Sequence, residues 1–150
     1  MIAVVQRILD GSITTDSGTI CAVGHGLCAL VAIERDDDRH DIDWMVRKLL
    51  TLRLFDDGDG RWARTLTDVD GDLLLVSNFT VAGRCRKGTR PDFSRSAAPG
   101  PARLQFELLA EALAARYPRV ATGVFGADMQ VALVNDGPVT VILESRKDTP

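Results

Sequence analysis

The stretch "MQVALVNDGPVTVILES", Met129 to Ser145, sets two apolar runs on either side of Asn135-Asp136-Gly137. Asp-Gly between apolar runs is a strong hairpin signal, so the residues predict two strands joined by a turn. Pro138 follows at once, where the returning strand would normally offer a backbone N–H. Only about 5–6% of X–Pro bonds in folded proteins are cis, so statistics favour a trans bond that starts an edge strand. A cis bond would instead turn the chain sharply and aim two successive carbonyl oxygens in nearly the same direction.

The rest of the chain alternates β-type and helical patterns. Residues 2–9, 26–33, 52–55, 71–81 and 120–126 have the composition of strands, and residues 11–24 that of a hairpin. Two amphipathic helices are predicted, with basic residues 83–101 as a loop before the second. The first presents Ile42, Met45, Val46, Leu49 and Leu50, and the second Leu104, Leu108, Ala112 and Leu113. With no linker or repeat, residues 1–150 are expected to form one compact α/β domain, with two helices covering a strongly curved sheet.

Composition limits the class of protein. Of 150 residues, 45% are hydrophobic and 26% charged, as in globular proteins. No apolar run reaches the roughly 18 residues of a membrane span, and no signal peptide is visible, so we expect a cytoplasmic protein that makes no membrane contact. The net charge of −3 would not draw the whole protein onto nucleic acid. A local phosphate-binding surface is still expected, because five cations stand against Asp92 in one segment: Arg84, Arg86, Lys87, Arg90 and Arg95.

No metal or cofactor is expected. The three cysteines form no C-x-x-C pair, and with only two histidines a zinc site is hard to assemble. We interpret Cys21, Cys28 and Cys85 as reduced packing residues. The acidic turns fail the EF-hand pattern, since Arg61 and Leu73 stand where a ligand and a glycine are required.

The strand predicted over 71–81 changes character at its end. It is apolar up to Val76 and then continues with Ser77, Asn78 and Thr80, beside the basic segment. Polar residues at such a position often bind ligands. They can equally cap the strand by bonding to nearby backbone, and the residues alone leave both interpretations open.

Several long blocks, in order, resemble one family. They are "AVVQR" at Ala3–Arg7, "DWMVRKLLTLRLF" at Asp43–Phe55, "SNFT" at Ser77–Thr80, "CRKGTRPDFSRSA" at Cys85–Ala97 and "GADMQVALVNDGPVT" at Gly126–Thr140. Together they cover nearly the whole chain and make it similar to the D-aminoacyl-tRNA deacylases. The resemblance implies the fold of that family, in which the curved, mixed sheet is barrel-like.

The resemblance also implies a function. Family members are homodimeric hydrolases that cleave the ester between tRNA and a D-amino acid, or mischarged glycine, as chiral proofreading in translation. It implies that the Gly137-Pro138 bond is cis and enters the partner subunit's active site, where its carbonyls reject L-amino acids. Arg7 and Met129 resemble residues that support this motif. We expect tRNA to be bound by the basic loop, through Arg84, Arg86, Lys87 and Arg90.

The resemblance places catalysis at Ser77, Asn78, Phe79 and Thr80. Backbone groups of Ser77–Phe79 are expected to act as oxyanion-hole donors while a water, oriented by the ribose 2′-OH, attacks the ester. Thr80 is an alternative nucleophile, but no strong base adjoins it in the sequence. The chain departs from the family where Asn78 replaces glutamine, and where Ala82 and Arg84 replace an aromatic residue and an acid.

Two other functions remain open on the residues alone. One is a nucleic-acid-binding module without catalysis, which would use the basic loop. The other is a small-ester hydrolase with Ser77 or Thr80 as nucleophile.

Overall fold

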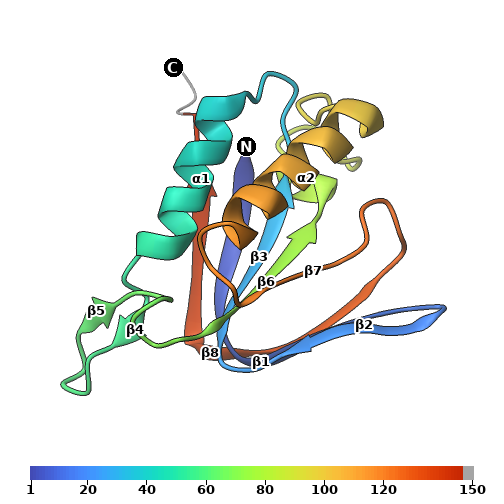
Figure 1. Ribbon diagram of the computed structural model, residues 1–150. Helices are drawn as coiled ribbons and strands as arrows, with labels where there is room; N and C mark the ends of the chain where they lie inside the picture. Colours follow the sequence, from blue (N-terminus) through green and yellow to red (C-terminus); the bar gives the residue numbers. More distant parts are fainter. Residues whose placement is uncertain (147–150) are drawn as a thin grey trace.

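The computed structural model describes residues 1–146, which form an α/β fold of one layer of helices on a curved sheet (Figure 1). Two α-helices and a short 3-10 helix accompany eight strands. The strands are β1 (Ile2–Thr15), β2 (Gly18–Val23), β3 (Gly26–Ala32), β4 (Phe55–Asp56), β5 (Trp62–Arg64), β6 (Asp72–Ser77), β7 (Val120–Thr122) and β8 (Gln130–Glu144). The helices are α1 (Arg39–Thr51), η1 (Phe79–Ala82) and α2 (Pro99–Ala114).

The main sheet is mixed and strongly bent. Its strands run in the order β2-β1-β3-β6-β7, and β8 pairs with β1 off this path. The β3–β6 and β6–β7 pairs are parallel, and the others in this sheet are antiparallel. Long strands β1 and β8 bend together, and α1 and α2 lie side by side on one face (Figure 1). The prediction of a barrel-like mixed sheet covered by two helices is confirmed.

The predicted hairpin at Asn135-Asp136-Gly137 is wrong. β8 is one strand that pairs with β1 on both sides of the motif, with Ile8 opposite Asn135 and Gln6 opposite Thr140. The extra residues of β8 between these pairs form a bulge, where no ladder hydrogen bond is needed from Pro138. The Gly137-Pro138 bond is cis, contrary to the trans bond that statistics favoured.

Helix α1 follows its sequence closely. Its N-cap, Asp38, accepts hydrogen bonds from the backbone N–H groups of His40 and Asp41, and the Asp41 carboxylate accepts from the Asp38 N–H. This reciprocal capping box fixes where the helix starts. The predicted apolar stripe of α1 is buried apart from Leu50, which is half-buried.

Helix α2 differs from prediction in its start and its buried face. It begins at Pro99, because proline suits the first helical position, so the loop is shorter than expected. Leu113 is buried as predicted, but Leu104 is 58% exposed, and Ala102, Phe106 and Leu109 complete the buried face. Because α2 has apolar residues on more than one side, its sequence pattern does not decide which side is buried, and packing against the sheet does.

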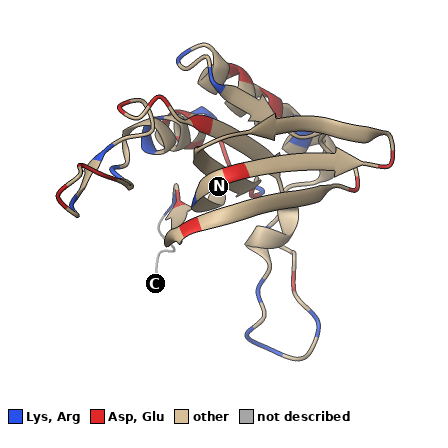
Figure 2. Cartoon of the chain, turned by 90° about the horizontal axis from the view of Figure 1, so that it is seen from below, with Lys and Arg blue, Asp and Glu red and all other residues tan. Residues whose placement is uncertain are grey.

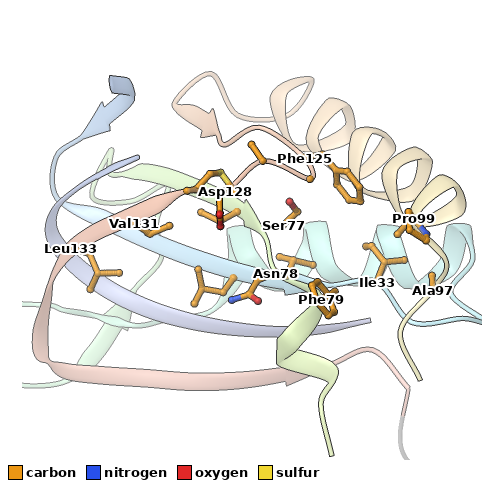
Figure 3. Close-up of a pocket in the computed structure, with 17 residues that line it drawn as sticks. Ile33, Ser77, Asn78, Phe79, Ala97, Pro99, Phe125, Asp128, Val131 and Leu133 are labelled. Carbon is orange, nitrogen blue, oxygen red and sulfur yellow. The ribbon is translucent and has the colours of Figure 1, made fainter. Parts of the chain in front are cut away.

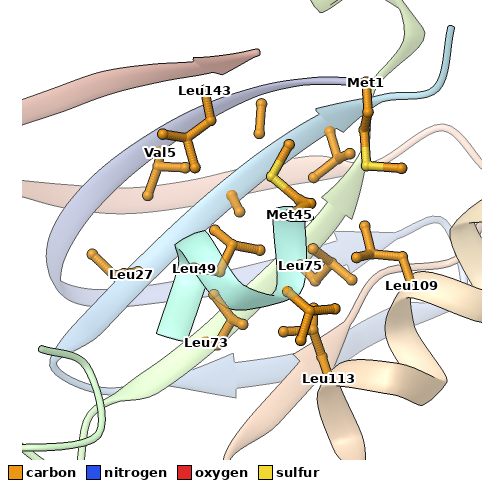
Figure 4. Close-up of a cluster of buried hydrophobic side chains, with 14 of the residues drawn as sticks. Met1, Val5, Leu27, Met45, Leu49, Leu73, Leu75, Leu109, Leu113 and Leu143 are labelled. Atoms are coloured by element: carbon orange, nitrogen blue, oxygen red, sulfur yellow. The ribbon is translucent and has the colours of Figure 1, made fainter. Parts of the chain in front are cut away.

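The core lies mainly between the sheet and the two helices. Figure 4 shows Leu73 and Leu75 of β6 meeting Leu109 and Leu113 of α2 there. A smaller cluster on the opposite face of the sheet contains Ile8, Ile13, Cys28, Leu74 and Val76. Alternate residues of β6 thus enter opposite clusters, and β6 is buried on both sides.

The cysteines only partly match the predicted packing role. Cys28 is buried, and burial raises the pKa of its thiol to about 12. Cys85 is exposed within the basic loop, so for this residue the packing interpretation is wrong.

Candidate active site

A cavity of about 1040 Å³ opens where β6 ends, on the face of the sheet away from α1 (Figure 3). Its floor comes from β3 and the end of β6, and one wall from residues 97–102 at the start of α2. The other wall comes from residues 125–129 and the first part of β8. Ser77, Asn78 and Phe79 line it, so three of the four predicted catalytic residues lie together at one cavity.

The strand end is shaped by two backbone hydrogen bonds of Asn78. Its N–H donates to the Val31 carbonyl at 2.8 Å, and its own carbonyl accepts from the Val81 N–H at 3.2 Å. The chain therefore leaves β6 and turns directly into η1, so the predicted strand stops at Ser77 instead of continuing to 81.

This turn decides which amides are available in the site. The Asn78 N–H is already bonded, whereas the N–H groups of Phe79 and Thr80 meet no acceptor within residues 1–146. The first N–H groups of any helix lack an intrahelical partner. Among the predicted oxyanion-hole donors, the Asn78 N–H is therefore occupied within the chain, whereas the Phe79 N–H is free within the described residues at this end of the cavity.

Thr80 lacks the partner that a nucleophile requires. Its hydroxyl donates to Oδ1 of Asn78 at 2.5 Å, and a side-chain amide cannot take up a proton. No His, Asp or Glu contacts Thr80 in the described chain. Activation of a hydroxyl nucleophile needs an adjacent base, so this geometry does not support covalent catalysis by Thr80.

Phe79 joins the cavity to the basic loop, residues 83–98. Its ring is 59% exposed and meets Phe93 edge-on, with 5.2 Å between ring centroids. The Phe79 carbonyl accepts a hydrogen bond from the Ser96 hydroxyl at 3.2 Å. A Cβ on Gly83 would lie 2.7 Å from the Phe93 ring, so only glycine leaves room for this contact. The base of the loop is thus fixed beside the cavity.

The outer part of the basic loop projects into solvent as a cationic finger (Figure 2). The backbones of Arg84 and Asp92 bond to each other in both directions, at 2.8 and 2.9 Å, and close its stem. The four cations predicted to bind tRNA are all exposed: Arg84, Arg86, Lys87 and Arg90. Arg95 instead pairs with Glu34 at 2.7 Å.

The Gly137-Pro138 motif lies outside the cavity of its own chain. Both residues are exposed. Arg7 holds this region: its Nε is 2.9 Å from the Asp136 carboxylate, and Nη1 donates to the Leu54 carbonyl at 2.8 Å. A Cβ on Gly137 would come within 3.2 Å of Nη2 of Arg7.

Met129, the second residue predicted to support the motif, lines the cavity of its own chain. Its sulfur packs over Gly123, where an added Cβ would lie only 2.7 Å away. Within one chain, Arg7 therefore contacts the motif region and Met129 lies in a different place.

Residues 125–128 form a wall that the sequence did not single out. Phe125 packs on Phe106, and Arg103 of α2 lies over the Phe125 ring at 5.0 Å from its centroid. Asp128 is the one charged residue in the lining. Residues 126–128 sit within a block that carried the family resemblance, but only the tertiary structure brings them to the same cavity as Ser77.

Residues 1–146 contain no group of three or more His, Cys, Asp or Glu placed to hold a metal ion. None of their helices has both the length and the apolar character needed to cross a bilayer.

Comparison with known proteins identifies the family. The sequence model described as "D-Tyr-tRNA(Tyr) deacylase" matches residues 4–144. The chain belongs to this deacylase family. The resemblance found in the sequence is therefore confirmed.

Deacylase relatives match at full length. The D-aminoacyl-tRNA deacylase of Desulfitobacterium hafniense is 45% identical over 148 residues, covering 99% of each chain. That of Teredinibacter turnerae is 48% identical over 145 residues, covering 97% of this chain and all of the relative.

Solved structures agree with the deacylase fold. A structure titled "c-Myc DNA Unwinding Element Binding Protein" is 39% identical, with a TM-score of 0.92, and the match covers 98% of this chain and 100% of that one. A probable eukaryotic D-amino acid tRNA deacylase has a TM-score of 0.80 over 95% of this chain and 97% of its own. At 15% identity, the second likeness concerns the fold alone.

Proposed function

We propose that this protein hydrolyses the ester bond between a D-amino acid and tRNA. The observation that carries the proposal is the cavity at the end of β6, beside two unbonded backbone N–H groups, in a chain of the deacylase family. Glycine mischarged on tRNA is a second substrate. Such an enzyme clears esters that would otherwise reach the ribosome, so we place it in the cytoplasm.

The chemistry needs no side-chain nucleophile. Water attacks the ester carbonyl, and the N–H groups of Phe79 and Thr80 stabilise the negative charge that develops on the carbonyl oxygen. The bond to the terminal ribose then breaks, its oxygen takes a proton, and free D-amino acid and tRNA leave. The adjacent ribose 2′-OH orients the water. Asn78 holds the Thr80 hydroxyl and so helps to fix the turn that presents these amides.

Discrimination against L-amino acids requires a second subunit. Gly137 and Pro138 lie outside the cavity of their own chain, so we propose that the partner's motif enters it and that its carbonyl groups exclude an L side chain. A dimer is supported by exposed apolar side chains on the paired strands β1 and β8, namely Leu9, Val134 and Ile142. Selection by exclusion does not grip the accepted side chain, so D-amino acids of many sizes and glycine can enter.

The first experiment compares hydrolysis of matched D-tyrosyl-, L-tyrosyl- and glycyl-tRNA by the purified protein, with EDTA in a parallel series. We expect loss of the D-ester and the glycyl ester, survival of the L-ester, and no effect of EDTA. Bound tRNA with none of the esters hydrolysed would contradict the proposal.

Removal of Arg7 should weaken discrimination. Arg7→Ala takes away the ion pair to Asp136 and the donor to Leu54, so the region around the motif loses its anchor. We expect the ratio of D- to L-tyrosyl-tRNA hydrolysis to fall about 10-fold, the effect of losing one charged hydrogen bond. Arg116→Ala, which changes an exposed arginine just after α2, is the control. An unchanged ratio in a folded, dimeric Arg7→Ala protein would exclude this positioning role.

The basic loop should control affinity for tRNA and its salt dependence. In the variant Arg86→Gln/Lys87→Gln/Arg90→Gln, KM for D-tyrosyl-tRNA should rise, and the slope of log KM against log salt should fall by about 2–3. Arg84→Asp should act in the same direction. D-tyrosyl-adenosine, which has no phosphate, serves as the control substrate, and its KM should not change. Equal salt slopes for wild type and variant would show that these cations contact no phosphate.

One observation favours a second candidate, a nucleic-acid-binding protein without catalysis. A full-length structure at 39% identity carries a DNA-binding title, and the basic loop offers an exposed cationic surface. The hydrolysis assay separates the two, because a binding module would retain tRNA and leave every ester intact. A small-ester hydrolase would need a base beside its serine or threonine nucleophile, and Thr80 has none in the described part of the chain.

A further inference from the structure

The carboxylate of Asp128 has no protein partner, although it lies in the cavity. Figure 3 shows it pointing into the space beside Ser77 and Val131. Among residues 1–146 it forms neither a hydrogen bond nor an ion pair. Most of the other lining residues are apolar, and none is Lys or Arg, so its charge is not neutralised by the wall.

Arg103, a basic residue that packs on this wall, already has protein partners. Arg103 lies over the Phe125 ring, and its guanidinium contacts the Phe125 carbonyl at 3.5 Å and Glu107 at 3.9 Å. Asp128 is exposed to solvent and supplies the single charge of the lining formed by residues 1–146, so it favours ligands that carry a positive group.

A D-aminoacyl ester has one such group. Its α-amine is one carbon from the scissile carbonyl, and α-amines with a pKa of about 7.7–8.0 are largely protonated at neutral pH. Phe79 belongs to the floor of the cavity at the end of β6, and Asp128 belongs to the wall formed by residues 125–129. An ester whose carbonyl oxygen lies at the Phe79 amide can therefore turn its ammonium towards Asp128.

We propose that Asp128 binds the α-ammonium of the substrate and so restricts the enzyme to aminoacyl-tRNA with a free amine. This inference rests on the proposed deacylase function. Formylated or peptidyl esters carry a neutral amide in place of the ammonium. Such an amide forms no ion pair with Asp128 that would offset the loss of the water it displaces. Asp128 is thus a specificity-determining residue that separates free aminoacyl-tRNA from the N-blocked species used in initiation and elongation.

The test compares Asp128→Asn, which has nearly the same shape, with wild type on D-tyrosyl-tRNA and N-acetyl-D-tyrosyl-tRNA. For the free amine, KM should rise about 10- to 100-fold with little change in kcat, as expected for a lost hydrogen bond to a charged group. For the acetylated ester, the two proteins should behave alike. Asp128→Glu should recover part of the affinity, and Glu111→Gln, an exposed acid on α2, is the control.

A second measurement needs no blocked substrate. In wild type, KM should rise as pH increases through about 8, because the α-ammonium loses its proton there. In Asp128→Asn this rise should be absent. A wild type that hydrolyses neither ester contradicts the deacylase function itself. An active wild type with unchanged KM in Asp128→Asn, or an equal loss on both esters, overturns the role of Asp128 alone.

Discussion

Phe79→Pro should lower kcat for D-tyrosyl-tRNA by about 10²- to 10³-fold relative to Phe79→Ala, the usual effect of removing one oxyanion-hole donor. Proline has no N–H, so this substitution deletes the backbone group proposed to contact the developing charge. The backbone accepts it, because Phe79 is the first residue of η1, where proline is favoured. The preceding Asn78 lies outside the α region that a following proline disfavours, with φ −149° and ψ 90°.

Phe79→Ala is the necessary reference because it removes the ring, and with it the contact to Phe93, while keeping the N–H. Single-turnover rates at saturating enzyme isolate the chemical step, and thermal unfolding shows whether both variants keep the fold. Equal rates in the two variants would mean that the Phe79 amide does not stabilise the transition state.

Gly26→Ala should destabilise the fold by about 3–5 kcal/mol, a large part of the 5–15 kcal/mol typical of a domain. Gly26 opens the parallel pair of β3 with β6, opposite Asp72. An added Cβ would lie 1.9 Å from the Asp72 carbonyl oxygen and 2.5 Å from its nitrogen, so the two backbones would have to separate. That separation would loosen β6, the strand that leads into the turn at Asn78. Urea unfolding followed by circular dichroism measures the change.

Gly100→Ala is the matched control for Gly26→Ala. Gly100 lies in the first turn of α2, and an added Cβ would meet no atom within 4 Å. Alanine is the better helix former, so this change should stabilise by up to about 1 kcal/mol. Similar stability changes in the two variants would show that the close approach of β3 to β6 does not limit residue size.

Local pattern was enough for much of the fold. The apolar stripe and the Asp38 cap predicted α1, because both depend on residues within a few positions of one another. The blocks around Arg7, Ser77 and Gly137 were enough to identify the family. The polar change at Ser77 also marked the end of β6, where the cavity lies.

Tertiary structure decided what depends on distant partners. The Asn135-Asp136-Gly137 pattern predicted a hairpin, but β1 is long enough to pair with β8 on both sides of it, so the extra residues became a bulge. The buried face of α2 was set by which of its apolar residues met the sheet, and Leu104 was left outside.

The sequence by itself determined the family, helix α1 and the place where β6 ends, because these follow from local periodicity and from blocks of residues in order. Only the tertiary structure separated Met129 from Arg7 and assigned the free amides to Phe79 and Thr80. It also placed the unpaired carboxylate of Asp128 in the cavity with Ser77. The physical reason is that strand pairing and helix packing bring together groups far apart in the chain, and no spacing within the sequence encodes those contacts.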